Sequence, residues 1–128
     1  MGDRLAENKR TVLAFYDLAF NQGRPAAAVE RYVGDTYTQH DPAVADGKDG
    51  VIDHFARMAA EHPGKRARFV RLVAEGNYVV LHSRQAWPGG PDRAAIAIFR
   101  LDEGGKVVEH WGVVQAVPDR GANDNGMV

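Results

Sequence analysis

The chain has 128 residues, no cysteine, and 16 basic against 17 acidic side chains, which leaves a formal net charge of -1. This length suits one domain with its own core, the missing cysteines exclude disulfides and thiolate chemistry, and the balanced charge argues against nucleic-acid binding. The charged N-terminal segment lacks the apolar core of a secretory signal, and no apolar run approaches the ~20 residues that span a bilayer, so we expect a cytoplasmic protein that makes no membrane contact.

The first half of the chain has helical periodicity, with apolar residues recurring at intervals of three and four. Gly23 ends the first segment, Pro25 begins the second, and Asp46 is expected to cap the third with its side chain. The predicted helices span residues 5–21, 25–34 and 47–62. Residues 35–40 form a predicted short strand, which the turn at Asp41 closes.

After residue 65 the period changes to two, which is typical of strands that bury one face. Turn sequences separate four such strands, over residues 66–75, 78–87, 94–101 and 107–117. Helices followed by this meander indicate an α+β fold, with three helices packed on one face of a strongly bent antiparallel sheet and a cavity between the layers. Residues 1–118 are the predicted domain, and the polar residues 119–128 are a predicted C-terminal tail.

Four segments resemble one known family. They are AFYDLAFNQG (14–23), RYVGDTYTQHDPAVADGKDG (31–50), IFRLDEGGKVVEHW (98–111) and QAVPDRGANDNGMV (115–128). They are similar to the SnoaL-like branch of the nuclear transport factor 2-like superfamily, a branch described as predicted aldol-condensation enzymes related to polyketide cyclases. The resemblance covers nearly the whole chain and implies a cone of curved sheet and helices, a homodimer through the sheet, and a pocket at the open end.

The resemblance also implies acidic residues at two pocket positions where this chain has none. An aspartate usually precedes the strand sequence IFR and another usually follows the HW pair, but the residues here are Ala97 and Gly112. The related QHNP motif reads Gln39-His40-Asp41-Pro42, so a carboxylate stands where an amide is usual. Two expected acid–base groups are therefore missing, and Asp41 is a candidate for a relocated one.

The candidate catalytic residues are His40, His110 and Asp41. Histidine exchanges protons near neutral pH, and both histidines lie on segments that can line the pocket. The alternative for each is a partly buried histidine bonded to a neighbour, and for His82, a candidate substrate contact, this structural interpretation is favoured. Asp41 would act as a general base if an apolar pocket desolvated it. The competing and favoured role of its side chain is to close the turn before Pro42.

Aromatic residues are the other candidate substrate contacts. Tyr37 can donate a phenolic hydrogen bond to a carbonyl or enolate oxygen, although strand alternation places it on the face opposite His40. Trp111 suits a ligand cavity, a dimer contact or the core. Phe15 and Phe55 lie on the buried faces of the first and third predicted helices.

No metal and no cofactor is expected, because the histidines lack metal-ligand spacing and the paired glycines lack the spacing of a phosphate-binding loop. We predict cofactor-independent proton transfer, in an aldol condensation, cyclisation or isomerisation, on a small hydrophobic or carbonyl-containing molecule. The alternative is a non-catalytic ligand-binding or dimeric accessory module that has lost the pocket carboxylates, as Ala97 and Gly112 indicate.

Overall fold

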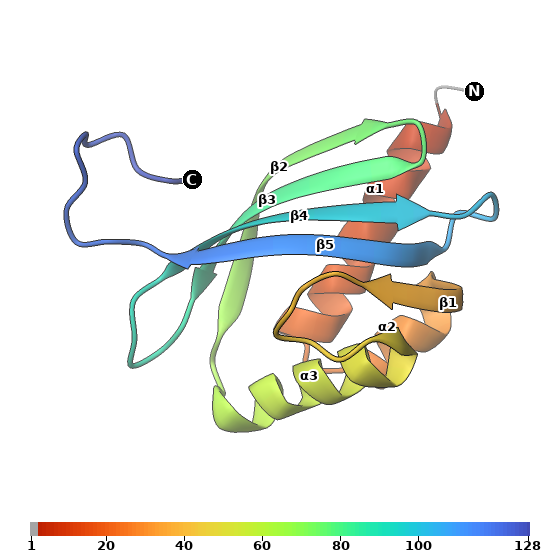
Figure 1. Ribbon diagram of the computed structural model, residues 1–128, viewed down its shortest axis with the longest axis horizontal. Helices are drawn as coiled ribbons and strands as arrows, with labels where there is room; N and C mark the ends of the chain where they lie inside the picture. The colour runs from red at the N-terminus through yellow and green to blue at the C-terminus, as the bar shows by residue number, and fades with distance from the viewer. Residues whose placement is uncertain (1–2) are drawn as a thin grey trace.

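The computed structural model describes residues 3–128 and shows helices packed on one face of a curved sheet (Figure 1). The helical part comprises α1 (Asp3–Tyr16), a π-helical turn η1 (Asp17–Asn21), α2 (Pro25–Tyr32) and α3 (Gly47–Glu61). The strands are β1 (Val33–Gln39), β2 (Arg66–Glu75), β3 (Tyr78–Ala86), β4 (Arg93–Leu101) and β5 (Val107–Ala116). The predicted α+β class, with three helices against one bent sheet, is confirmed.

The five strands lie in the order β1-β5-β4-β3-β2. Strands β2 to β5 form the predicted antiparallel meander, but β1 lies at the edge beside β5 and runs parallel to it, so the sheet is mixed. Parallel neighbours are joined by long crossovers, and no local sequence pattern announces such a pairing. The register places Gln39 opposite His110, which brings together the two segments that carry the candidate catalytic residues.

The inner face of the sheet and the helices enclose the core. On β3 the side chains of Leu81 and Ser83 are buried against the helices, and the residues between and beside them are more exposed. Phe15 of α1 meets Phe99 of β4 edge to face, with ring centroids 6.2 Å apart. Such aromatic pairs add to the stabilisation that burial itself provides.

The first helix does not continue as an α-helix to Asn21, because residues 17–21 form the π-helical turn η1. This turn buries Leu18, Ala19 and Phe20, three consecutive residues that an α-helix of 3.6 residues per turn would direct to different faces. Asn21 then holds the turn on the sheet. Its Nδ2 donates to the carbonyl of Ala67 (3.1 Å) and its Oδ1 accepts from the N–H of the same residue (2.7 Å).

The side chain of Asp46, which was predicted to cap α3, instead holds the loop between β1 and α3. Asp46 occupies the N-cap position of α3, but its carboxylate accepts no hydrogen bond from that helix. Its Oδ1 instead accepts from the backbone N–H of Gln39 at 2.8 Å. The predicted capping by this side chain is therefore wrong, because the carboxylate closes the loop that carries Asp41.

The chain after Ala116 has no helix or strand. It turns back toward β3 (Figure 1), where Nε2 of His82 donates to the carbonyl of Met127 at 2.9 Å. Within residues 3–128, the structure has no helix that is both long and apolar enough to cross a membrane.

Candidate functional site

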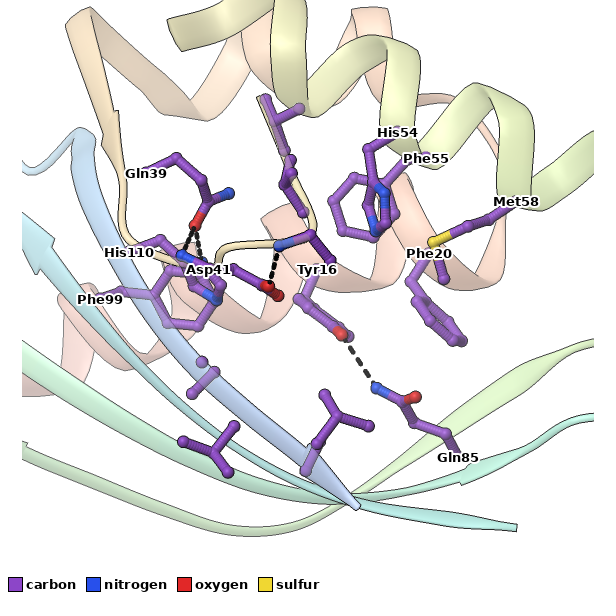
Figure 2. Close-up of a pocket in the computed structure, with 18 of the residues that line it drawn as sticks. Tyr16, Phe20, Gln39, Asp41, His54, Phe55, Met58, Gln85, Phe99 and His110 are labelled. Carbon is purple, nitrogen blue, oxygen red and sulfur yellow. Dashed lines mark hydrogen bonds between the residues drawn. The ribbon is translucent and has the colours of Figure 1, made fainter. Parts of the chain in front are cut away.

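A cavity of about 520 Å³ lies between the inner face of the sheet and the helices. Aromatic and aliphatic side chains form most of its wall, and a few polar side chains project into it (Figure 2). The polar ones are Tyr16, Tyr37, Gln39, Asp41, His54, Gln85, Arg93 and His110. This size and composition are typical of a site for a small organic molecule.

A hydrogen bond across β1 and β5 fixes the tautomer of His110. The Oε1 atom of Gln39 accepts from the backbone N–H of Asp41 (3.0 Å) and lies 2.7 Å from Nδ1 of His110. Because this oxygen only accepts, Nδ1 of His110 carries the proton and donates it. The lone pair of Nε2 is left for the cavity.

The Asp41 carboxylate contacts both the turn and the cavity. Its Oδ1 accepts from the N–H of Ala43 at 2.9 Å, which is the predicted turn contact. Its Oδ2 lies close to Gly112: a Cβ added at Gly112 would be 3.9 Å from this oxygen and 3.2 Å from Nε2 of His110. Because Gly112 has no side chain, a space remains at this position. The Asp41 carboxylate and the Nε2 lone pair of His110 both lie beside that space.

A second chain of hydrogen bonds orients Tyr16 at the end of α1. The indole Nε1 of Trp87 donates to Oε1 of Gln85 (3.1 Å), and Nε2 of Gln85 lies 3.2 Å from the Tyr16 hydroxyl oxygen. An indole N–H only donates, so Gln85 must present its oxygen to Trp87 and its amide N–H to Tyr16. The hydroxyl of Tyr16 is thus an acceptor toward Gln85, and its own proton remains to be donated into the cavity (Figure 2).

Burial decides the protonation states around the cavity. It lowers the pKa of His110 to about 4, against an opposing effect of the Asp41 charge. Burial also lowers the pKa of His54 on α3 and raises the pKa of Tyr16 and of Tyr37. Near neutral pH the cavity therefore contains neutral imidazoles and protonated phenols.

The lowered pKa of His110 predicts a loss of stability in acid. Since the folded protein holds this imidazole neutral, its stabilising effect is complete above pH 6.5 and is lost as the pH falls toward about 4. Over this range we expect the free energy of unfolding to fall more in the wild type than in a His110→Gln variant, by about 2–3 kcal/mol. Thermal unfolding at both ends of the range measures this difference. An equal loss in the two proteins would contradict the prediction, and His62→Gln, at an exposed helix end, is the control.

Three of the predicted site residues lie outside the cavity. His40 points away from it, with Nε2 at 2.7 Å from a carboxylate oxygen of Glu109 and the imidazole ring stacked on Trp111 at 4.7 Å between centroids. Trp111 and His82 lie on the outer face of the sheet, where His82 also contacts Arg71. His40 and Asp41 both directly follow β1, where the N–H of His40 donates to the carbonyl of His110, and of the two only Asp41 lines the cavity.

The other predicted residues, Tyr37, Phe15, Phe55, Asp41 and His110, do line the cavity. The cavity is also lined by five residues that were not among the predicted site residues, namely Tyr16, Gln39, His54, Gln85 and Arg93. Gln85 shares an alternating strand face with apolar neighbours, and a polar residue on such a face was the available signal for a buried polar group. Among residues 3–128, no group of three or more histidine, aspartate or glutamate side chains is placed to hold a metal ion.

The fold and the cavity together define a cone-shaped domain with a pocket of small-molecule size. Residues 12–110 match the SnoaL-like domain family, and the chain belongs to that family. The resemblance found in the sequence motifs is thereby confirmed. No curated protein matches the sequence.

Solved structures share this fold. TsrD from Streptomyces laurentii is 21% identical, with a TM-score of 0.72 over 84% of this chain and 87% of that chain. A proposed polyketide cyclase from Acidithiobacillus ferrooxidans is 18% identical, with a TM-score of 0.72 over 84% and 87%. A proposed isomerase of the SnoaL-like family from Agrobacterium tumefaciens is 19% identical, with a TM-score of 0.70 over 85% and 98%. At these identities the likeness establishes the fold, and the chemistry must be argued from the site.

Proposed function

We propose that the protein is a cytoplasmic, cofactor-independent enzyme that moves a proton at a carbon next to the carbonyl group of a small substrate, in a cyclisation, aldol or isomerisation reaction. One observation carries this proposal: Oδ2 of Asp41 and Nε2 of His110 lie beside the same space at Gly112, in a cavity that also contains the donor Tyr16. Removal of such a proton needs a base and a hydrogen-bond donor for the developing enolate oxygen.

Asp41 is the proposed base. Its Oδ1 is held by the N–H of Ala43, so the carboxylate has a fixed orientation and Oδ2 is available to take the proton. No cationic side chain of residues 3–128 forms a salt bridge with it, and the neighbouring His110 is kept neutral by burial, which lowers its pKa. No salt bridge within the described part of the chain therefore occupies the carboxylate, and Oδ2 is free to approach a substrate.

Tyr16 is the proposed donor to the enolate oxygen, and His110 is the proposed second proton carrier. The phenol stays protonated because burial raises its pKa, and its orientation is set by Gln85. Nε2 of His110 accepts a proton or a hydroxyl hydrogen bond from the substrate while Nδ1 remains bound to Gln39. A donor aimed at developing charge in an apolar cavity stabilises it more than water would, because nothing has to reorient.

The alternative of a non-catalytic module rested on Ala97 and Gly112. These two residues face each other on β4 and β5, and both line the cavity. The Asp41 carboxylate lies beside this same position. An acid–base group is therefore present even though the two expected carboxylates are not, which favours catalysis over simple binding.

The test is hydrogen–deuterium exchange at carbons next to the carbonyl groups of a panel of small ketones, followed by NMR in deuterated buffer. We expect the protein to accelerate exchange for at least one compound, without added metal or cofactor. Equal rates with and without the protein across the panel would contradict the proposed function. Binding without exchange would support the accessory module instead.

A homodimer through the sheet is a second part of the proposal. The helices cover only the inner face (Figure 1), and large apolar side chains are exposed on the outer one, including Val113 at 74% and Ile96 at 50%, two residues that also border the cavity. Val113 and Ile96 are cross-strand neighbours, so the exposed surface is continuous. A two-fold axis would set this apolar patch against its own copy, which buries apolar area on both protomers.

Val113→Asp is expected to weaken the dimer at least about 10-fold, because it places an unpaired carboxylate in each half of the interface. Light scattering coupled to size-exclusion chromatography over a dilution series measures the change. Thr36→Asp, on the exposed part of β1, adds the same charge elsewhere and should leave the dimer intact. A wild-type protein that is monomeric at tens of micromolar would rule out this interface.

A further inference from the structure

Arg93 is the one arginine or lysine among the residues that line the cavity, and Asp41 is the one carboxylate. Arg93 is the first residue of β4 and lies opposite Gln85 on β3. Paired residues of adjacent strands share a face of the sheet, so Arg93 projects to the inner side with Gln85. The cavity thus has a cation at this end and an anion near Gly112 on β5.

The guanidinium of Arg93 has no acidic partner among residues 3–128. The salt bridges there join His40 and Arg100 to Glu109, and Arg84 to Asp92. Asp92, the adjacent residue, is therefore already paired on the other side of the strand. A half-buried cation at an apolar cavity costs free energy unless an anion neutralises it. Arg93 is therefore available to bind an anion that the chain itself does not supply.

Trp87 holds this guanidinium in place. The central carbon of the guanidinium lies 4.2 Å from the centre of the indole ring, a cation–π contact. Trp87 is in turn fixed by the hydrogen bond from its Nε1 to Gln85. The Trp87 ring face offers no conventional hydrogen-bond acceptor, so the contact leaves the guanidinium N–H groups available to bind a carboxylate through two parallel hydrogen bonds.

We infer that the substrate of the proposed reaction carries a carboxylate that binds Arg93, at the end of the molecule remote from the carbon that loses its proton. This inference rests on the proposed function, and it specifies the substrate class as small keto acids. A single cation matches a single negative charge. No second arginine or lysine of residues 3–128 is among the residues that line the cavity, and Lys65 donates from Nζ to the carbonyl of Phe20, which disfavours a doubly charged phosphate.

The spacing of the strands sets the length of this molecule. Arg93 and Ala97 are four residues apart on β4, which corresponds to about 13 Å along the strand. Ala97 lies opposite Gly112, where Asp41 approaches. The long side chain of Arg93 covers part of that distance, so the substrate needs an apolar body between its carbonyl and its carboxylate, in keeping with the aromatic walls.

The test compares acids with their neutral methyl esters. 4-Acetylbenzoate and 4-acetylphenylacetate, in which a benzene ring separates the ketone from the carboxylate, are titrated against the wild-type protein as purified, together with both esters and phenyl phosphate, by calorimetry. At least one acid is expected to bind about 10- to 100-fold more tightly than its ester. Arg93→Gln is expected to abolish that preference, Arg93→Lys to keep part of it, and Arg10→Gln, an exposed residue of α1, to leave it unchanged.

Equal binding of acids and esters, or a preference that persists in Arg93→Gln, would overturn the inference. Tighter Arg93-dependent binding of phenyl phosphate than of both acids would overturn the assignment of a carboxylate. Exchange measured on the same compounds separates the two proposals. A preference for acids that depends on Arg93, without hydrogen–deuterium exchange, supports the carboxylate site and contradicts the proposed function. Exchange at equal rates in acids and esters supports the proposed function and contradicts the carboxylate site.

Discussion

Asp41→Asn is expected to lower the rate of proton exchange at the substrate carbon by about 10²- to 10⁴-fold, the range that a positioned general base contributes. The substitution is nearly isosteric. The asparagine Oδ1 can still accept from the N–H of Ala43, a contact that the aspartate makes at 2.9 Å, so the turn should be preserved. The amide that replaces Oδ2 takes up no proton, and catalysis alone should suffer.

NMR exchange rates and thermal unfolding of the same samples check this prediction. The loss should appear in kcat, with substrate affinity changed little and the melting temperature within a few degrees of the wild type. Asp53→Asn, on the exposed side of α3, removes one carboxylate without touching the cavity and is the matched control. An Asp41→Asn protein that exchanges at the wild-type rate would exclude Asp41 as the base.

Gly112 explains why the carboxylate can occupy this place. A Cβ there would lie 3.0 Å from Cε1 of His110, which is tighter than ordinary carbon–carbon contact. An acidic side chain at 112 would have to extend from the same point into the space beside Asp41. Two like charges so close cannot both be ionised at little cost. An acid at position 41 therefore disfavours a second acid at position 112, because the two carboxylates would repel each other.

The sequence predicted the layers of the fold because each depends on local periodicity. The third helix ends at Glu61, within one residue of its predicted end, and β2 and β3 are separated at residues 76–77 as expected. Local patterns failed where a contact is distant or irregular. The register of β2 shifts between Phe69 and Arg71, so these two residues, which strict alternation would place on one face, lie on opposite faces.

The site was harder to predict for the same physical reason. Periodicity separates the two faces of a strand but does not say which one the helices cover. Once β3 turns Gln85 inward, His82 is necessarily outward, and the choice between His40 and His110 likewise follows from the parallel pairing of β1 with β5. Tyr16 lies within the first predicted helix, but the orientation of its hydroxyl depends on Gln85, 69 residues away.

Tyr16→Phe is expected to lower the exchange rate by about 10²- to 10³-fold, the effect of removing one donor to a developing oxyanion. The phenylalanine fills the same space but leaves the amide N–H of Gln85 without its 3.2 Å partner, so a fall of about 1–3 kcal/mol in the free energy of unfolding is expected as well. Rates must therefore be normalised to the folded fraction. A rate that stays at the wild-type value after this correction would remove Tyr16 from the mechanism.

Trp87→Phe distinguishes a catalytic hydroxyl from a merely structural one. Without the indole N–H, which donates to Gln85 at 3.1 Å, the Gln85 amide is free to turn its oxygen toward Tyr16. The phenol would then donate its proton to Gln85 and no longer to the substrate, so the exchange rate should fall although Tyr16 is still present. Adding Gln85→Leu to this variant removes the competing acceptor and should restore part of the rate, because the Tyr16 proton is again available. Failure of the second substitution to raise the rate would show that the hydrogen-bond chain packs the cavity wall without orienting the donor.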